Sequence, residues 1–467
     1  MTKSSRTPSG PTGPAEGGSR MWVWIVAGTV AVLALAVFSS RRPAAPAGAE
    51  PAPATDRGGR AESGGDRAWA GGQAEPHAAR LLRSRSGGVG VVPEAVVADK
   101  VATFARGRRQ LAEDYARHLG IAVPPQVEEF LMAAEGGNWD EVKTLFNTLS
   151  AERERRRGEA EFEALWPLVR ETYGVSQAAQ SWPAGELLNY GESLLGSLRP
   201  GTVYIAGTDD ARYVPMLMGE TGGGDRPVIL PQNALADASQ LDYLGYLHGG
   251  RLATLSRDDL QQVFSEFVQA NASEGAAQGG GAVTIPGPAA LAGLNEKLVR
   301  LLMERNPALP FALEQSVAMP GLAAQAMPLG PVLELPGPGT AAVGVEARAA
   351  GSLQFWQDTA QRLQADASLP PDAPARAAYA QLATGQAAQL ARQNLHAESE
   401  QAYRLARDIA PGSPDAVGKL AAYLAERGRR AEAYQVIEDF SMLEDHYRFM
   451  ADELRRAVDE ASSAPNP

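Results

Sequence analysis

The chain has 467 residues and a formal net charge of −12, so its body has no overall attraction to nucleic acid. It contains no cysteine, which excludes disulfides, thiolate metal sites and cysteine nucleophiles. Hydrophobic residues make up 44% of the chain but aromatic residues only 6%, a balance that indicates helices packed through small side chains.

The N-terminus carries one segment that could span a membrane. Residues 1–20 are rich in Ser, Thr, Pro and Gly, and we predict that they are disordered. Residues 21–38 form an uncharged run of 18 residues, which as a helix just crosses a bilayer core. Trp22 and Trp24 lie near one end, where indole rings favour the membrane interface. We therefore predict a single-pass N-terminal anchor.

A cleaved signal peptide is the alternative for this run, with the small residues 47–49 as the cleavage site. The run is longer than a usual signal core, and Arg41 and Arg42 lie between it and that site, so the sequence favours the uncleaved anchor. Arginines flank both ends and leave the orientation open. We expect a periplasmic or extracytoplasmic body, because the anchor is N-terminal and a long tether follows it.

Residues 39–92 are predicted to be that tether. Pro-Ala repeats are followed by Gly-Gly pairs with no apolar periodicity, which is typical of a disordered linker. Arg80, Arg83 and Arg85 could touch anionic lipid, but the sequence favours a solvated linker that carries a few charges.

Helical periodicity begins at Pro93, a favourable first helical residue, and continues to a stop at Gly120. A second helix is predicted from residues 124–125, and a third follows the turn at residues 136–138. The run at residues 152–158 mixes acids with arginines, which is more typical of a solvated helix face than of a nucleic-acid site. We expect no nucleic-acid partner.

The centre of the chain is the stretch of residues 198–247. Apolar runs within residues 198–213 and 226–233 predict two short buried strands, each leading through a polar loop to a helix. Residues 311–313 and 331–335 are predicted to add further strands.

The carboxyl ends of the two central strands carry the candidate ligand site. In open α/β sheets, ligands bind outside the carboxyl ends of strands. The candidate ligand-binding residues there are Thr208, Asp209, Asp210, Arg212, Gln232 and Asn233. The alternative needs no ligand: Thr208 or Asp209 caps the following helix, and the two aspartates complement its positive end.

Other chemical devices are not found in the sequence. The five histidines are scattered, and none belongs to a His-Glu-x-x-His arrangement. There is no Gly-x-Ser-x-Gly elbow and no Walker loop. We therefore expect no metal, no cofactor and no catalytic residue.

A 34-residue pattern occurs twice within residues 380–446. Its positions are Ala387, Leu390, Tyr403, Ala406 and Pro411 in the first copy and Ala421, Leu424, Ala433, Ile437 and Phe440 in the second. The small residues Ala387 and Ala421 would let the two helices of each unit approach closely, and the larger residues would fill the space between them.

This pattern resembles the tetratricopeptide repeat family. The resemblance implies stacked helical hairpins that present a protein-contact surface and no chemistry. Ser399 departs from the pattern, which has alanine there, and the second copy has Phe440 in place of a small residue and lacks the closing proline. The helices before and after the two units are expected to cap the stack. A simpler alternative is that these helices only pack against the α/β part.

A second resemblance covers about 50 residues, from residue 198 to residue 247. The order Arg-Pro-Gly-Thr-Val-Tyr-Ile-Ala-Gly-Thr-Asp-Asp, then a helix, then Arg-Pro-Val-Ile is similar to the soluble segment of some bacterial protein O-mannosyltransferase-like membrane proteins. Because the chemistry of those proteins is assigned to a multi-spanning part, the resemblance implies an accessory α/β module without transferase activity. The whole arrangement also resembles uncharacterised bacterial membrane-anchored tetratricopeptide proteins.

The predicted fold class is mainly α with a small α/β unit. The predicted parts are a disordered N-terminus (1–20), a transmembrane helix (21–38), a tether (39–92), a helical region (93–175), an α/β module (176–340, with a disordered insert at 273–287) and a repeat-like helical domain (341–460). We expect a non-enzymatic, membrane-anchored scaffold of the bacterial envelope that binds a protein partner through its C-terminal helices. The alternative is an α/β domain that binds or acts on an envelope glycan or lipid-linked sugar at Asp209 and Asp210.

Overall fold

The computed structural model describes residues 92–156, 160–223, 226–275, 288–317, 319–337, 344–367 and 369–463. The predicted anchor at residues 21–38 and nearly all of the predicted tether lie outside these ranges. Among the residues that are described, none of the helices combines the length and the apolar character that a membrane span requires.

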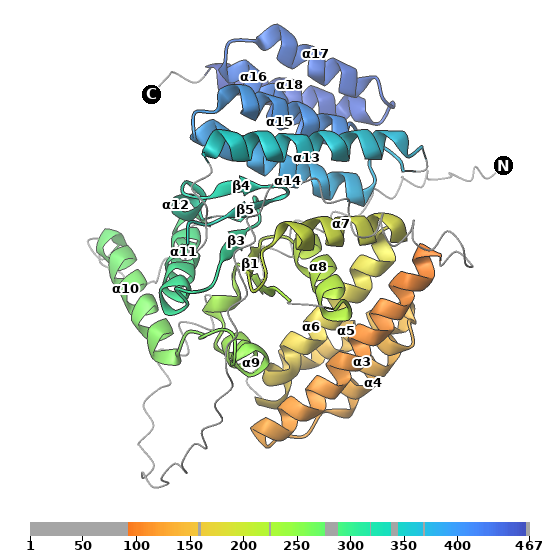
Figure 1. The fold of residues 1–467 in the computed structure, drawn as a ribbon, viewed down its shortest axis with the longest axis vertical. Helices are drawn as coiled ribbons and strands as arrows, with labels where there is room; N and C mark the ends of the chain where they lie inside the picture. The colour runs from red at the N-terminus through yellow and green to blue at the C-terminus, as the bar shows by residue number, and fades with distance from the viewer. Residues whose placement is uncertain are drawn as a thin grey trace, which may run out of the picture. The chain divides into compact units, whose positions relative to one another are not determined.

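The described chain is mainly helical and contains one small mixed sheet, which confirms the predicted fold class at this level (Figure 1). The helices before the last strand are α3 (Pro93–Leu119), α4 (Pro125–Glu135), α5 (Trp139–Arg155), α6 (Ala160–Ser181), α7 (Ala184–Ser197), α8 (Asp209–Thr221), α9 (Ala238–His248), α10 (Arg257–Gly275), α11 (Pro288–Arg305) and α12 (Pro320–Ala323). The later helices are α13 (Val345–Ala365), α14 (Pro374–Arg392), α15 (His396–Ile409), α16 (Pro414–Glu426), α17 (Arg430–Ser441) and α18 (Tyr447–Ser463).

Local sequence explains where the first helices begin and end. Helix α3 starts at a proline and stops at Gly120, whose φ of 70° is in the left-handed region that glycine adopts without strain. The side chain of Asn138 caps α5 by accepting a hydrogen bond from the amide of Glu141. Helices α3, α4, α5 and α6 then pack together around the buried side chains of Phe130 and Leu131.

The sheet has the order β2-β1-β3-β5-β4. Its strands are β1 (Val203–Ala206), β2 (Val228–Pro231), β3 (Phe311–Leu313), β4 (Met327–Leu329) and β5 (Val332–Glu334). Strands β2, β1 and β3 are parallel, whereas β5 runs antiparallel to both β3 and β4. Helix α8 connects β1 to β2, and the chain then crosses through α9, α10 and α11 to reach β3 on the other side of β1.

Helices cover both faces of this sheet. Along β1, Tyr204 and Ala206 belong to a core that includes residues of α7, α8 and α14. Val203 and Ile205 point to the opposite face and belong to a core that includes residues of α11 and α12. All four residues of β1 are buried, because alternate side chains of a strand face opposite sides and both sides are covered here.

Two predicted boundaries differ from the structure, and one strand was not predicted. The strand predicted at residues 331–335 is only β5, and β4 beside it was not predicted, because a three-residue strand that contains Pro328 gives no apolar alternation. Residues 273–275, predicted to begin a disordered insert, continue α10 instead. The rest of that insert, from residue 276 to residue 287, lies outside the described residues.

A close contact between α6 and α8 makes a single glycine important for packing. A Cβ atom added at Gly174 would lie 2.2 Å from the ring of Tyr213, so no side chain fits there. We expect Gly174→Ala to lower the free energy of unfolding by about 2 kcal/mol, because overpacking outweighs the better helix propensity of alanine. Chemical denaturation followed by fluorescence measures this change.

The matched control is Gly107→Ala in α3, where an added Cβ atom meets nothing within 4 Å. This variant should be stabilised by about 0.5–1 kcal/mol, because only the helix propensity changes. Equal effects of the two substitutions would contradict the close packing of α6 against α8.

The C-terminal helices form two antiparallel hairpins, α14–α15 and α16–α17, and α18 packs on both α16 and α17. The repeat positions of both copies are buried except Pro411, which is half-buried. Ser399, the departure from the pattern, is fully buried, and its hydroxyl donates to the carbonyl of Ala387 at 2.8 Å. A serine is therefore tolerated between the helices of the first hairpin because its hydroxyl has a backbone acceptor.

Candidate functional site

The polar loop after β1 lies at the point where the sheet reverses its strand order. The chain leaves β1 toward β2 on one side and later returns to β3 on the other side, so the carboxyl ends of β1 and β3 flank the crevice where open α/β sheets bind ligands. Gly207 and Thr208 follow β1 directly, and Glu314 directly follows β3.

The side chain of Glu314 occupies this crevice. One carboxylate oxygen accepts hydrogen bonds from the amide of Gly207 and, at 2.8 Å, from the amide of Thr208. The other accepts from the hydroxyl of Thr208 at 2.8 Å and from the hydroxyl of Ser316 at 2.9 Å. The carboxylate of Glu314 thus accepts hydrogen bonds from the amides just before α8, which would otherwise be available to an anionic ligand.

Thr208 and the two aspartates are placed by the start of α8. Thr208 is the N-cap residue, and its hydroxyl accepts from the amide of Ala211 at 3.3 Å. Asp209 is exposed in the first turn, whereas Asp210 is partly buried and accepts a hydrogen bond from the indole of Trp182 at 3.1 Å. Thr208 therefore caps α8 and Asp210 packs against Trp182, whereas Asp209 contributes only its charge to the first turn of the helix.

Of the remaining predicted ligand residues, Gln232 lies beside this loop, because its amide donates to the carbonyl of Ala206 at 2.9 Å, whereas Arg212 does not. Arg212 is 4% exposed and lies within α8, where its guanidinium covers the ring of Tyr213 and lies 3.6 Å from Glu171. Gln232 is half-buried after β2, and Asn233 is exposed at the start of the 3-10 helix at Ala234–Ala236. The structure thus brings Thr208, Asp209, Asp210 and Gln232 to the same edge of the sheet, together with Glu314, which the sequence interpretation missed.

Burial shifts the acid–base behaviour of the two carboxyl groups that flank this loop. Burial, assisted by the neighbouring Asp209 and Glu314, raises the pKa of Asp210 to about 6, although the hydrogen bond from Trp182 opposes the rise. Burial also raises the pKa of Glu314, while its hydrogen bonds from Thr208 oppose that rise.

The Asp210 shift predicts a pH dependence of stability. Because its pKa in the folded state exceeds the ordinary value of 3.8, the folded protein holds this proton more tightly than the unfolded chain does. That stabilisation is complete below pH 3.8 and is lost as the pH rises through about 6. Relative to wild type, Asp210→Asn should therefore gain about 2 kcal/mol of stability between pH 4 and pH 8. Urea denaturation at a series of pH values measures the difference, and parallel pH profiles would contradict it.

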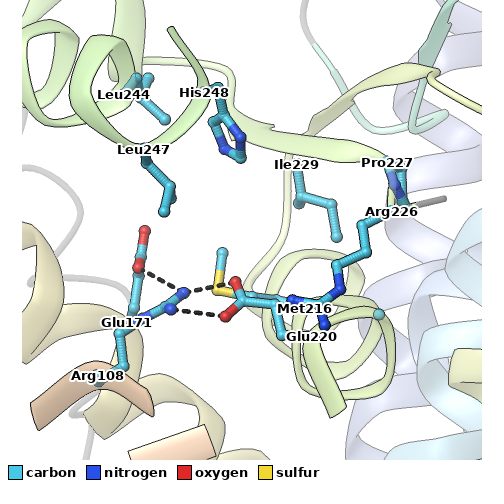
Figure 2. Close-up of a pocket in the computed structure, with 11 residues that line it drawn as sticks. Arg108, Glu171, Met216, Glu220, Arg226, Pro227, Ile229, Leu244, Leu247 and His248 are labelled. Carbon is cyan, nitrogen blue, oxygen red and sulfur yellow. Dashed lines mark hydrogen bonds and ion pairs between the residues drawn. The ribbon is translucent and has the colours of Figure 1, made fainter. Parts of the chain in front are cut away.

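A second polar cluster, which the sequence interpretation did not identify, surrounds Arg108. Figure 2 shows its guanidinium between the carboxylates of Glu171 and Glu220. It donates to both oxygens of Glu220, at 2.6 Å from Nη1 and 2.5 Å from Nη2, and Nη2 lies 3.0 Å from Glu171. Tyr243 donates its hydroxyl hydrogen to Glu171 at 2.8 Å. One arginine thus joins side chains from α3, α6 and α8, and Glu171 extends the cluster to α9.

Electrostatics keep Arg108 charged although it is buried. Burial alone would lower the pKa of Arg108, but Tyr243, Glu220 and Glu171 together raise it above its ordinary value. Burial lowers the pKa of His248, beside the cluster in Figure 2, to about 4, so this imidazole is neutral at pH 7.

The cavity beside the Arg108 cluster is too small for a substrate. Its volume is about 20 Å³, which is room for about one water molecule. Because Arg108 forms ion pairs with two internal carboxylates, the cluster is best explained as a clamp that holds α3, α6 and α8 together. The sequence did carry one signal for it: Arg108 lies four residues after Phe104, within the apolar stripe of α3.

Among the residues that the structure describes, no group of three or more His, Asp or Glu side chains could hold a metal ion.

Comparison of the chain with protein-family models, curated proteins and solved structures found no match. The fold and the site together define a mainly helical protein with a small mixed sheet, whose predicted ligand loop is filled by one of its own carboxylates.

Proposed function

We propose that this protein is a non-enzymatic scaffold of the bacterial envelope, anchored by residues 21–38 and binding a protein partner through tetratricopeptide-like C-terminal helices. The observation that supports the proposal is the pair of successive hairpins, α14–α15 and α16–α17. Equivalent positions of the two hairpins lie 34 residues apart in sequence, and their side chains are buried. Burial of Ala387 and Ala421 at equivalent places supports the resemblance to the repeat family.

One end of this helical stack is covered by the chain itself. Helix α14 is buried on most of its surface, and Gln386 donates to the carbonyl of Gly330 at 3.2 Å. Gln393, just beyond α14, donates to the carbonyl of Ala326 at 2.9 Å. A partner therefore has little access to α14, and the opposite end of the stack is the better surface.

That opposite end carries exposed apolar side chains. Met442 is 76% exposed and Phe449 is 69% exposed, and Leu443 lies between them in sequence at the turn from α17 to α18. Exposed apolar residues that cluster on a soluble domain often mark a protein-contact surface. We assign partner binding to this turn, which we call the α17–α18 tip.

Site-specific photocrosslinking in cells tests the assignment. A photoreactive residue at position 449 should give a defined crosslink to a partner protein, and Phe449→Asp combined with Met442→Asp should abolish complex formation. The matched control is position 132 on α4, because Met132 is also an exposed methionine, at 49%. Equal crosslinking from positions 132 and 449, or none from 449, would refute the proposed surface.

The alternative function, an envelope glycan or lipid-linked sugar bound at Asp209 and Asp210, has less support. Glu314 fills the neighbouring crevice, and Asp210 is engaged by Trp182. The double variant Asp209→Asn and Asp210→Asn distinguishes the two functions, because the scaffold proposal expects unchanged complex formation from it.

A further inference from the structure

The exposed apolar side chains of the α17–α18 tip are concentrated in one short stretch. Seven large hydrophobic side chains are exposed in the part of the chain that the structure describes, and three of them, Met442, Leu443 and Phe449, lie within residues 442–449. The other four are scattered between residues 92 and 268. Scattered apolar side chains are ordinary on a protein surface, whereas a cluster indicates an occupant.

The tip is held in shape by buried side chains beneath it. Phe440 and Tyr447, on the two sides of the turn, are buried, and their ring centroids lie 4.6 Å apart. Arg455 of α18 also donates a hydrogen bond to Glu438 of α17, which ties the two helices together near the turn. Because the space beneath the turn is filled, Met442 and Phe449 remain in solvent, and a partner meets them already in place.

Acidic side chains surround these apolar ones. Residues 438–456 contain six exposed acids and three arginines, which gives a net charge of −3 with histidine counted as neutral. Two acids precede Met442 by four and three residues, and two follow Phe449 by three and four, so on each helix they share the face of the apolar side chain. The six acids, which we call the acidic rim, are Glu438, Asp439, Glu444, Asp445, Asp452 and Glu453.

The arginines do not neutralise the acidic rim. Arg448 pairs with Asp445 at 2.9 Å, and Arg455 is shared between two other acids of the rim. Asp439 accepts a hydrogen bond from the side chain of Gln435 at 2.8 Å, and Glu444 lies 3.3 Å from the imidazole of the exposed His446. Neither Asp439 nor Glu444 has an arginine or lysine as its ion-pair partner among the described residues, so both can pair with cations of another molecule.

The charge of the rim decides between the possible occupants of the tip. A second copy of the chain would bring two acidic rims together, and a membrane surface of anionic lipid would be repelled as well. A protein helix with cationic side chains beside an apolar face would complement both the charge and the apolar side chains.

We therefore propose that the α17–α18 tip binds a basic amphipathic helix of the partner protein. The apolar face of that helix lies on Met442, Leu443 and Phe449, and its lysines or arginines pair with the acidic rim. This inference rests on the proposed scaffold function and adds the chemistry of the partner to it.

Fluorescence anisotropy with labelled model helices and the full chain tests the charge preference. Two peptides of about 18 residues share one leucine and phenylalanine face, and their other positions carry lysine in the first and glutamate in the second. The lysine peptide should bind with a dissociation constant of about 10–100 µM at low salt, and the glutamate peptide at least about tenfold more weakly. A lysine peptide with alanine in place of the apolar face should also bind about tenfold more weakly, because charge alone does not supply the apolar contact.

Reversing two charges of the rim tests whether the peptide binds at the tip. Asp439→Lys combined with Glu444→Lys should weaken the lysine peptide about tenfold and strengthen the glutamate peptide, because these two exposed acids face no internal arginine. The matched control is Glu128→Lys combined with Glu129→Lys. It reverses two exposed acids that precede the exposed Met132 by four and three residues, and it should leave both affinities unchanged.

Equal binding of the lysine and glutamate peptides, or equal effects of the two double variants, would overturn this inference and leave the scaffold function intact. An apparent mass that doubles with concentration in wild type but not in Phe449→Asp would also overturn it, because a second copy would then be the occupant. If neither peptide binds, the inference is wrong, and the crosslink from position 449 decides the scaffold function separately: a defined crosslink keeps that function, and its absence refutes it.

Discussion

Replacing Arg108 with methionine should lower the free energy of unfolding by about 4 kcal/mol, measured by urea denaturation. The guanidinium is buried and pairs with both Glu171 and Glu220. Methionine fills much of the volume but leaves Glu171 buried, with the more distant Arg212 and the hydroxyl of Tyr243 as its remaining partners. Most of the expected loss is therefore the cost of an under-compensated buried charge, rather than the value of the ion pairs themselves.

The neighbouring arginine provides a close control. Arg109 is 34% exposed and forms an ion pair with Glu135 at 3.1 Å, near the surface. Arg109→Met should cost less than about 1 kcal/mol, because solvent screens exposed pairs. A loss below about 1 kcal/mol for Arg108→Met as well would show that the clamp between α3, α6 and α8 contributes little to stability.

Replacing Glu314 with alanine should be the second strongly destabilising change, at about 3 kcal/mol. The substitution leaves the amides of Gly207 and Thr208 without their acceptor, and it empties the crevice between β1 and β3. Because donors at the start of α8 are then free, the variant should also bind sulfate or phosphate, which wild type should not. Denaturation and anion titration measure the two effects.

Two further variants separate the charge of Glu314 from its shape. Ser316→Ala removes one hydroxyl donor and should cost only about 1 kcal/mol. Glu314→Gln keeps an oxygen for the two amides and should recover most of the loss seen with alanine. If alanine and glutamine were equally destabilising, the carboxylate charge rather than the filled crevice would be the main contribution.

Arg108 and Arg392 have different partners in the fold. Arg108 is surrounded by internal acceptors and has no capacity for a ligand. Arg392 is held by one neutral amide and stays exposed beside a larger cavity. The surroundings of an arginine therefore depend on which partners the fold places near it, and these cannot be judged from the residue type.

Local sequence determined the elements of this protein. Helical spacing from Pro93 to Gly120 predicted α3, and the capping chemistry of Thr208 or Asp209 predicted a helix start there, which the structure places with Thr208 as the cap of α8. Two apolar runs predicted β1 and β2, because four-residue strands buried on both faces need continuous apolar sequence. These features depend on residues a few positions apart, where sequence alone carries the information.

Tertiary structure alone decided what the polar residues do. Glu314 meets Gly207 across 107 positions of sequence, and Arg108 meets Glu220 across 112. No local pattern encodes such pairs, because they depend on how strands and helices from distant segments come together. The same reason explains why the predicted ligand loop is filled from within.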